Sequence, residues 1–193
     1  MLSRPPRSDA AHLRVLAHPT RLRLLGLLRE RGPQTAAMLA TDVDEAPGTL
    51  SYHLGRLAAA GYIHEEERPG DRRARWWAAS HPATVWDHAE LSADPDDFAA
   101  SREMYRVVMQ EYARRFDAYL AATPSLDDAW VRAALSTDRM LRLTPAQLQG
   151  LRDDLLAVTA KWQAVSDAAG AEASPVSDAA PVTVVLQAYR SVP

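Results

Sequence analysis

The sequence contains no cysteine, only two phenylalanines and a single lysine, Lys161. The missing cysteine excludes disulfide bonds, thiolate metal ligands and cysteine nucleophiles. No apolar run approaches the roughly 18 residues that a membrane-spanning helix needs. The basic N-terminus leads into no apolar stretch of the kind that a secretory signal contains. Together these absences predict a soluble, cytoplasmic protein without a membrane partner.

Charge is distributed unevenly along the 193 residues, although the formal net charge is only −3. Residues 1–80 carry 12 arginines against 9 acidic residues, whereas residues 81–193 carry 10 basic against 16 acidic residues. Because 47% of the residues are hydrophobic, both parts have the composition of folded domains, and their opposite charge predicts different partners. We therefore expect a flexible N-terminus at 1–9, a basic domain at 10–80, a linker at 81–95 and an acidic domain at 96–193.

Three short helices are expected between residues 9 and 40. The first is the amphipathic segment 9–17. Pro19 suits the first position of the second helix, because its missing N–H would be unpaired there anyway. Gly32 can end that helix in a left-handed cap, and Thr35 can cap the third helix with its hydroxyl.

A fourth helix, expected from about Pro47 to Ala60, has one apolar and one polar face. Leu50, Leu54 and Leu57 recur at helical spacing, so these leucines should face the core. A helix fits the major groove of DNA, where varied polar side chains can reach base edges. The residues predicted to read bases are those of the polar face, Thr49, Ser51, Tyr52, His53 and Arg56. For His53 taken alone, a structural role in the core is the alternative.

Two aromatic-bearing segments, 62–66 and 74–78, flank a Pro-Gly turn and predict a β-hairpin with a basic tip. Short helices, a tight turn, a polar-faced helix and a hairpin follow one another in the order of a winged helix-turn-helix. This order predicts a double-stranded DNA partner, whereas each polar residue taken alone fits a solvated surface better. The expected contacts to the DNA backbone come from the wing and the second helix, through Arg68, Arg72, Arg73 and Arg21.

The same region resembles the ArsR-type winged-helix regulators at residues 16–25 (LAHPTRLRLL), 48–54 (GTLSYHL) and 60–63 (AGYI). The resemblance covers roughly residues 10–80. It implies a homodimeric repressor that occupies an inverted-repeat operator and leaves it when a signal arrives. The chain departs from the family at Asp44 and Ala46, where the family usually has glycine and serine. Alanine is a poor N-cap, so the recognition helix should start less firmly.

Metal sensors of this family place Cys, His and Asp ligands on the third helix or on a C-terminal helix. The third helix expected here, residues 36–40, offers no ligand. The remaining candidate ligands lack the paired-histidine spacing of the C-terminal site. A solvated polar segment is the simpler interpretation of these residues, which are His81, Asp87, His88 and Glu90. We therefore expect no metal and no cofactor, and a signal of another kind.

The acidic part opens with apolar residues at helical spacing from about 97 to 122, which predicts one long amphipathic helix. Two interpretations of its apolar stripe remain open. The stripe can pair with a second copy of the chain, or it can pack within the same chain. The residues predicted to carry dimerisation are Tyr105, Met109, Tyr112 and Phe116.

Residues 129–135, 140–143 and 182–189 are expected as strands, and Thr144 with Pro145 should open a helix between them. The predicted fold class is thus mainly α, with an N-terminal winged helix-turn-helix and a C-terminal α+β domain for dimerisation and effector binding. Several aromatic residues could line an apolar effector pocket, although such residues more often belong to a plain core. They are Trp86, Trp130, Trp162, Tyr105, Tyr112 and Tyr119.

No Ser-His-Asp set, phosphate-binding loop or metal cage stands out in the sequence, so an enzyme is not expected. The predicted function is a sequence-specific DNA-binding transcriptional regulator released by a non-metal effector. Two alternatives remain at this point. One is a dimeric DNA-binding protein without an effector, and the other is a protein-interaction adaptor built on a winged helix.

Overall fold

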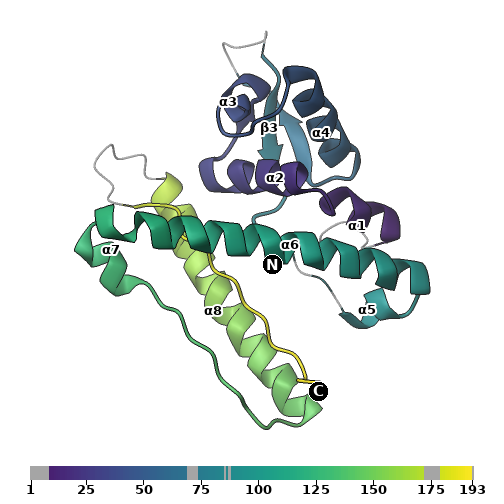
Figure 1. Cartoon of the computed structure of the whole chain (residues 1–193), viewed down its shortest axis with the longest axis vertical. Helices are drawn as coiled ribbons and strands as arrows, with labels where there is room; N and C mark the ends of the chain where they lie inside the picture. Colours follow the sequence, from purple (N-terminus) through teal and green to yellow (C-terminus); the bar gives the residue numbers. More distant parts are fainter. Residues whose placement is uncertain (1–8, 69–73, 85, 87, 172–178, 193) are drawn as a thin grey trace. The chain divides into compact units, whose positions relative to one another are not determined.

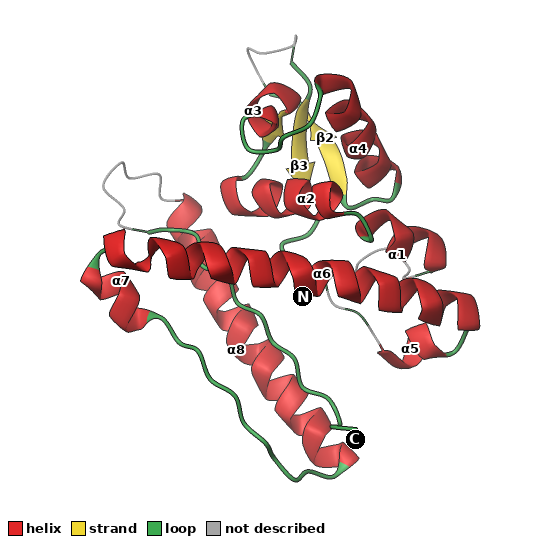
Figure 2. Cartoon of the chain, viewed as in Figure 1, coloured by secondary structure: helices red, strands yellow, loops and turns green. Residues whose placement is uncertain are grey.

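The computed structural model describes residues 9–68, 74–84, 86, 88–171 and 179–192. The chain divides into two compact units, Met1–Ser125 and Leu126–Pro193. Among the described residues the fold is mainly helical with one three-stranded antiparallel sheet (Figures 1 and 2), which confirms the predicted class and the winged helix-turn-helix. The units divide after the long helix, and not at the linker expected at 81–95.

Short-range signals place the first three helices, α1 (Ala10–Leu16), α2 (Pro19–Arg31) and α3 (Ala36–Ala40). The Asp9 side chain accepts a hydrogen bond from a backbone N–H of the first turn of α1. Pro19 lies in the first turn of α2, and Gly32 follows this helix with a φ of 73° that favours glycine. Thr35 caps α3 with its hydroxyl. The three predicted helices, the Pro19 start of α2 and the Thr35 cap of α3 are confirmed.

The recognition helix and the wing complete the DNA-binding fold. Helix α4 (Pro47–Ala59) ends before Gly61, whose φ of 73° turns the chain into the sheet. The strands lie in the order β1-β3-β2. They are β1 (Gln34–Thr35), β2 (Ile63–Glu66) and β3 (Trp76–Ala79). The predicted hairpin is confirmed in its strands, whereas its tip, with Arg72 and Arg73, lies outside the described residues.

The core of the first unit extends beyond the winged helix-turn-helix into α5 (His88–Ser92) and α6 (Pro95–Ala122). Ala100, Met104 and Val108 of α6 are buried in the same cluster as the leucines of α1, α2 and α4. The backbone N–H of Ala10 donates to Asp97 Oδ1 at 2.6 Å, which ties α1 to the start of α6. Helix α6 runs along α1 and α2 in Figure 1. This shared core is why the unit continues to residue 125.

The second unit contains α7 (Asp128–Ala133) and α8 (Pro145–Ala171). Thr144 and Gln147 form a reciprocal cap at the start of α8: each backbone N–H donates to the other side chain, at 2.9 and 3.3 Å. The predicted start of this helix is confirmed. No side chain in the described part of residues 126–193 is buried. No helix in the described part of the chain combines the length and hydropathy that a membrane crossing requires.

The strands predicted for the second half are wrong. Residues 128–133 form α7, because the Asp127 carboxylate accepts from the backbone N–H of Ala129 and starts a helix. Residues 140–143 and 182–189 are extended but belong to no sheet in the described part of the chain. A short apolar run fits either a helix or a strand, and a strand also needs a neighbour to pair with. The described C-terminal unit is therefore helical with extended segments, and not α+β.

Candidate nucleic-acid interface

Helix α4 separates its residues into a buried and an exposed face, as its sequence predicts. Leu50, Leu54 and Leu57 are at most 1% exposed and form part of the core. The exposed face carries four of the five predicted base-reading residues, Thr49, Ser51, Tyr52 and Arg56. Tyr52 is 62% exposed and stands well out from the helix. A side chain that reaches into a groove must first be free of the core, and these four meet that condition.

His53, the fifth predicted base reader, lies elsewhere. It is 5% exposed, and its ring faces His18 at the start of α2, with 4.5 Å between the ring centroids. The ring of the neighbouring Tyr52 meets the His53 ring edge-on, with 5.5 Å between the ring centroids. A side chain buried to this degree is held inside the fold, which favours the alternative interpretation of His53 as a structural residue.

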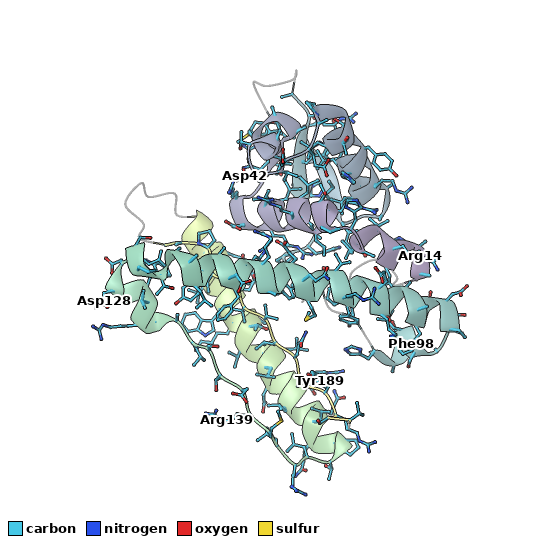
Figure 3. The ribbon with its side chains drawn as sticks, in the orientation of Figure 1. Arg14, Asp42, Phe98, Asp128, Arg139 and Tyr189 are labelled. Carbon is cyan, nitrogen blue, oxygen red and sulfur yellow. The ribbon has the colours of Figure 1, made fainter. Side chains whose placement is uncertain are left out.

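The turn before α4 is fixed from two sides. The Arg31 guanidinium donates two hydrogen bonds to the carboxylate of Asp42, at 2.7 and 2.9 Å, and Figure 3 labels Asp42 in this turn. The hydroxyl of Thr20 donates to Glu45 Oε1 at 3.0 Å, which connects α2 to the last residues of the turn. The position of α4 is therefore set by α2 as well as by its own leucines.

The first turn of α4 has no side-chain cap. Ala46 has the extended conformation of an N-cap residue, with φ −61° and ψ 145°, but its side chain offers no acceptor. The backbone N–H groups of the first turn therefore depend on water. Pro47 at the first position removes one such N–H and offsets part of the loss.

Replacing Ala46 with serine should raise the free energy of unfolding by about 1 kcal/mol, because the serine hydroxyl would accept from an N–H of the first turn. The measurement is urea unfolding of both proteins. Ala59→Ser is the matched control, since Ala59 is exposed at the other end of the same helix, where no N-cap forms. An equal gain for both variants would contradict the capping argument.

Arg21 of α2 adds a positive charge beside α4. Burial lowers the pKa of this guanidinium, and the positive charge of Arg56 lowers it further. The Nε atom of Arg21 is buried and has no hydrogen-bond partner among the described residues. Two arginines from two helices thus lie close enough for their charges to interact. An anion placed between them would relieve this repulsion, and a DNA phosphate is such an anion.

The wing holds its described arginines on aromatic rings. The Arg68 guanidinium lies 4.4 Å from the ring centroid of Trp76, and its Nε is 3.4 Å from Glu66. Arg75 lies 5.4 Å from the Trp77 ring centroid and 3.1 Å from Glu65. Stacking on a ring leaves the edge of a guanidinium available to a phosphate. Of the predicted wing contacts, Arg68 is described, whereas Arg72 and Arg73 are not.

The residues predicted to carry dimerisation are divided between two environments. Tyr105, Met109 and Tyr112 are partly buried and pack against the core of their own unit. Phe116, further along α6, is 47% exposed. Three of the four predicted dimerisation residues thus pack within their own chain, which agrees with the second interpretation of the apolar stripe of α6.

The aromatic residues proposed to line an effector pocket are likewise dispersed. Trp86 meets Tyr105 edge-on at 5.6 Å in the first unit. Trp130 and Trp162 belong to the second unit, where they are 39% and 60% exposed. Within the described part of the chain, no group of three or more His, Cys, Asp or Glu residues could hold a metal ion.

Sequence reasoning missed three residues that position α4. His18 precedes α2, Thr20 lies in its first turn and Glu45 precedes α4, so hydrophobic periodicity does not mark them. The one available signal was the pair of histidines itself, His18 at the start of the second helix and His53 within the fourth. In a helix-turn-helix these two helices pack together, which would have predicted the contact.

A family profile described as a helix-turn-helix domain matches residues 16–66. The uncharacterised HTH-type transcriptional regulator YcgE of Bacillus subtilis is 38% identical over 55 residues, which are 28% of this chain and 36% of that protein. The uncharacterised HTH-type regulator Rv0081 of Mycobacterium tuberculosis is 41% identical over 54 residues, which are 28% of this chain and 47% of that protein. The matched segment therefore spans less than half the length of either relative.

Among solved structures, the crystal structure of the ArsR family transcriptional regulator RHA00566 is similar to part of the chain. It is 27% identical, and the alignment covers 54% of this chain and 88% of that one with a TM-score of 0.32.

Proposed function

We propose that the protein is a sequence-specific DNA-binding transcriptional regulator of the ArsR type, because residues 16–66 match a helix-turn-helix domain profile. The observation that carries the proposal is the exposed face of α4. It presents Thr49, Ser51, Tyr52 and Arg56 on a helix whose other face is anchored in the core. We assign these four residues to base contacts in the major groove.

Contacts to the DNA backbone come from Arg21 of α2 and from the wing arginines Arg68, Arg72 and Arg73. Arg21 has the clearest structural support, since its guanidinium lies beside Arg56 and its Nε has no partner among the described residues. Phosphate contacts of this kind set the register of the recognition helix but carry no sequence information. The proposed activity is DNA binding rather than catalysis. We place the protein in the cytoplasm.

The regulator acts as a homodimer on an inverted repeat. Two copies of α4 would then enter successive major grooves on one face of the DNA, about 34 Å apart. The exposed end of α6 around Phe116 supports a contact with a second copy, and Tyr105, Met109 and Tyr112 hold that helix against its own unit. A non-metal effector acting through the second unit would change the spacing and release the operator.

Selection of DNA by the full chain from a random-sequence duplex library tests the proposal. A regulator of this kind enriches one inverted repeat and binds it far more tightly than the starting library. The affinity should also fall steeply as salt is raised, because phosphate contacts release counterions. Failure to enrich any sequence would refute sequence-specific binding and favour an interaction adaptor instead.

A further inference from the structure

Two histidines meet at the junction between α2 and the recognition helix. His18 is the residue before α2, and His53 lies in the middle of α4 on its buried side. Their ring centroids are 4.5 Å apart and the ring planes are tilted by 46°. The Nδ1 atoms of both rings are buried and have no hydrogen-bond partner among the described residues. The two rings therefore interact chiefly by packing against each other.

The groups around this pair are mostly cationic. Arg21 of α2 acts on both rings, and Arg56 of α4 acts on Arg21. Glu45, from the turn before α4, is the acidic residue whose charge reaches both histidines. Its carboxylate already accepts a hydrogen bond from Thr20. One shared carboxylate faces two imidazoles and an arginine.

Protonation of either histidine of this pair is therefore unfavourable. Burial lowers the pKa of His18, and the charges of His53 and Arg21 lower it further, against a smaller opposing effect of Glu45. Burial also lowers the pKa of His53, followed by the charge of Arg21. A proton on either ring would lose part of its hydration and would be repelled by the charge of Arg21.

We propose that His18 positions the recognition helix through His53, and that this contact holds α4 in its DNA-binding position only while both imidazoles are neutral. Protonation of either ring places a second positive charge beside Arg21, which weakens the contact and loosens α4 from α2. His18 is thus a positioning residue that never touches DNA, and it makes DNA affinity depend on pH. The inference rests on the proposed function, because it concerns the helix assigned to reading bases.

The direction of the pH effect follows from linkage. Both histidines have a pKa below the ordinary value of 6.5 in the folded chain, so the unfolded chain takes up protons first as the pH falls. The stabilisation that the pair contributes is fully present above pH 6.5 and is lost progressively below it. DNA affinity should decline over the same range.

The test compares the wild-type chain with His18→Phe, His53→Phe and the double variant. Phenylalanine keeps an aromatic ring and cannot be protonated, and it removes no hydrogen bond from the unpartnered Nδ1 atoms. His18→Phe is the milder change, since His18 is only partly buried, and it serves if His53→Phe folds poorly. His88→Gln is the matched control, because His88 is exposed on α5.

Two readouts are followed from about pH 7.5 to about pH 5.5 at constant ionic strength: affinity for the selected duplex, and the urea midpoint of the DNA-free chain. In the wild type and in His88→Gln the affinity should fall by about tenfold over this range. In His18→Phe and in the double variant this fall should shrink to less than about threefold. The urea midpoint should become correspondingly less dependent on pH.

Identical pH profiles for the wild type and the phenylalanine variants would overturn the proposal. So would a flattened urea profile accompanied by an unchanged affinity profile, because the proton would then act on stability without reaching the DNA-binding position. Failure of the proposed function looks different. In that case no duplex is enriched at any pH by any of the proteins, while the urea profiles still separate His18→Phe from His88→Gln.

Discussion

Truncating Leu54 to alanine lowers the free energy of unfolding of the first unit by about 3 kcal/mol. Leu54 is 0% exposed and lies at the centre of the buried face of α4. The variant loses the transfer free energy of three carbon atoms and leaves a cavity that tightly packed neighbours fill only in part. Domains of this size are stable by about 5–15 kcal/mol, so the loss is a large share of the total.

Urea unfolding followed by tryptophan fluorescence measures this effect, since Trp77 is 7% exposed in the first unit. Leu135→Ala is the matched control: it is the same chemical change at a side chain that is 83% exposed. The control should lose less than about 1 kcal/mol. Equal losses in the two variants would mean that α4 is not anchored by its leucines.

Arg56→Ala should weaken binding to the selected duplex by about 1–3 kcal/mol, roughly 5-fold to 150-fold, and relax the sequence preference at one position of each half-site. Arg56 is exposed on the polar face of α4, where a guanidinium can make two hydrogen bonds to a guanine edge. Affinity for random duplex should change far less. Competition binding against both duplexes provides the measurement.

Arg21→Ala is the informative comparison, because Arg21 is assigned to a phosphate. This variant should weaken binding to selected and random duplexes alike, and lower the salt slope by about 1. Arg102→Ala controls for the loss of a positive charge, since Arg102 is exposed on α6. A uniform loss in Arg56→Ala with unchanged preference would reassign Arg56 to the DNA backbone.

The fold of the first unit was largely predictable because its signals are local. The cap at Thr35 acts within one helical turn, and Gly61 ends α4 through its own backbone conformation. The apolar face of α4 follows from helical periodicity alone. The uncapped start at Ala46 was predictable for the same reason.

The sequence predicted the polar face of α4 as the candidate site, but it did not predict which residues at the border of that face are exposed. His53 is adjacent in sequence to Tyr52, and both are polar aromatic residues of one helix. Tyr52 is 62% exposed and His53 is 5% exposed, because α2 covers one side of α4 and His18 lies there. Which residues at the border between two helix faces are covered depends on the neighbouring helix, and composition carries no information about it.

By itself the sequence determined α1 to α4, α6 and α8 and the winged helix-turn-helix, since these depend on residues a few positions apart. Only the tertiary structure decided that α6 completes the first core and that His18 meets His53. It also decided that 140–143 and 182–189 join no sheet among the described residues. Contacts between distant segments depend on which surfaces meet, and a strand needs a paired neighbour that its own sequence does not specify.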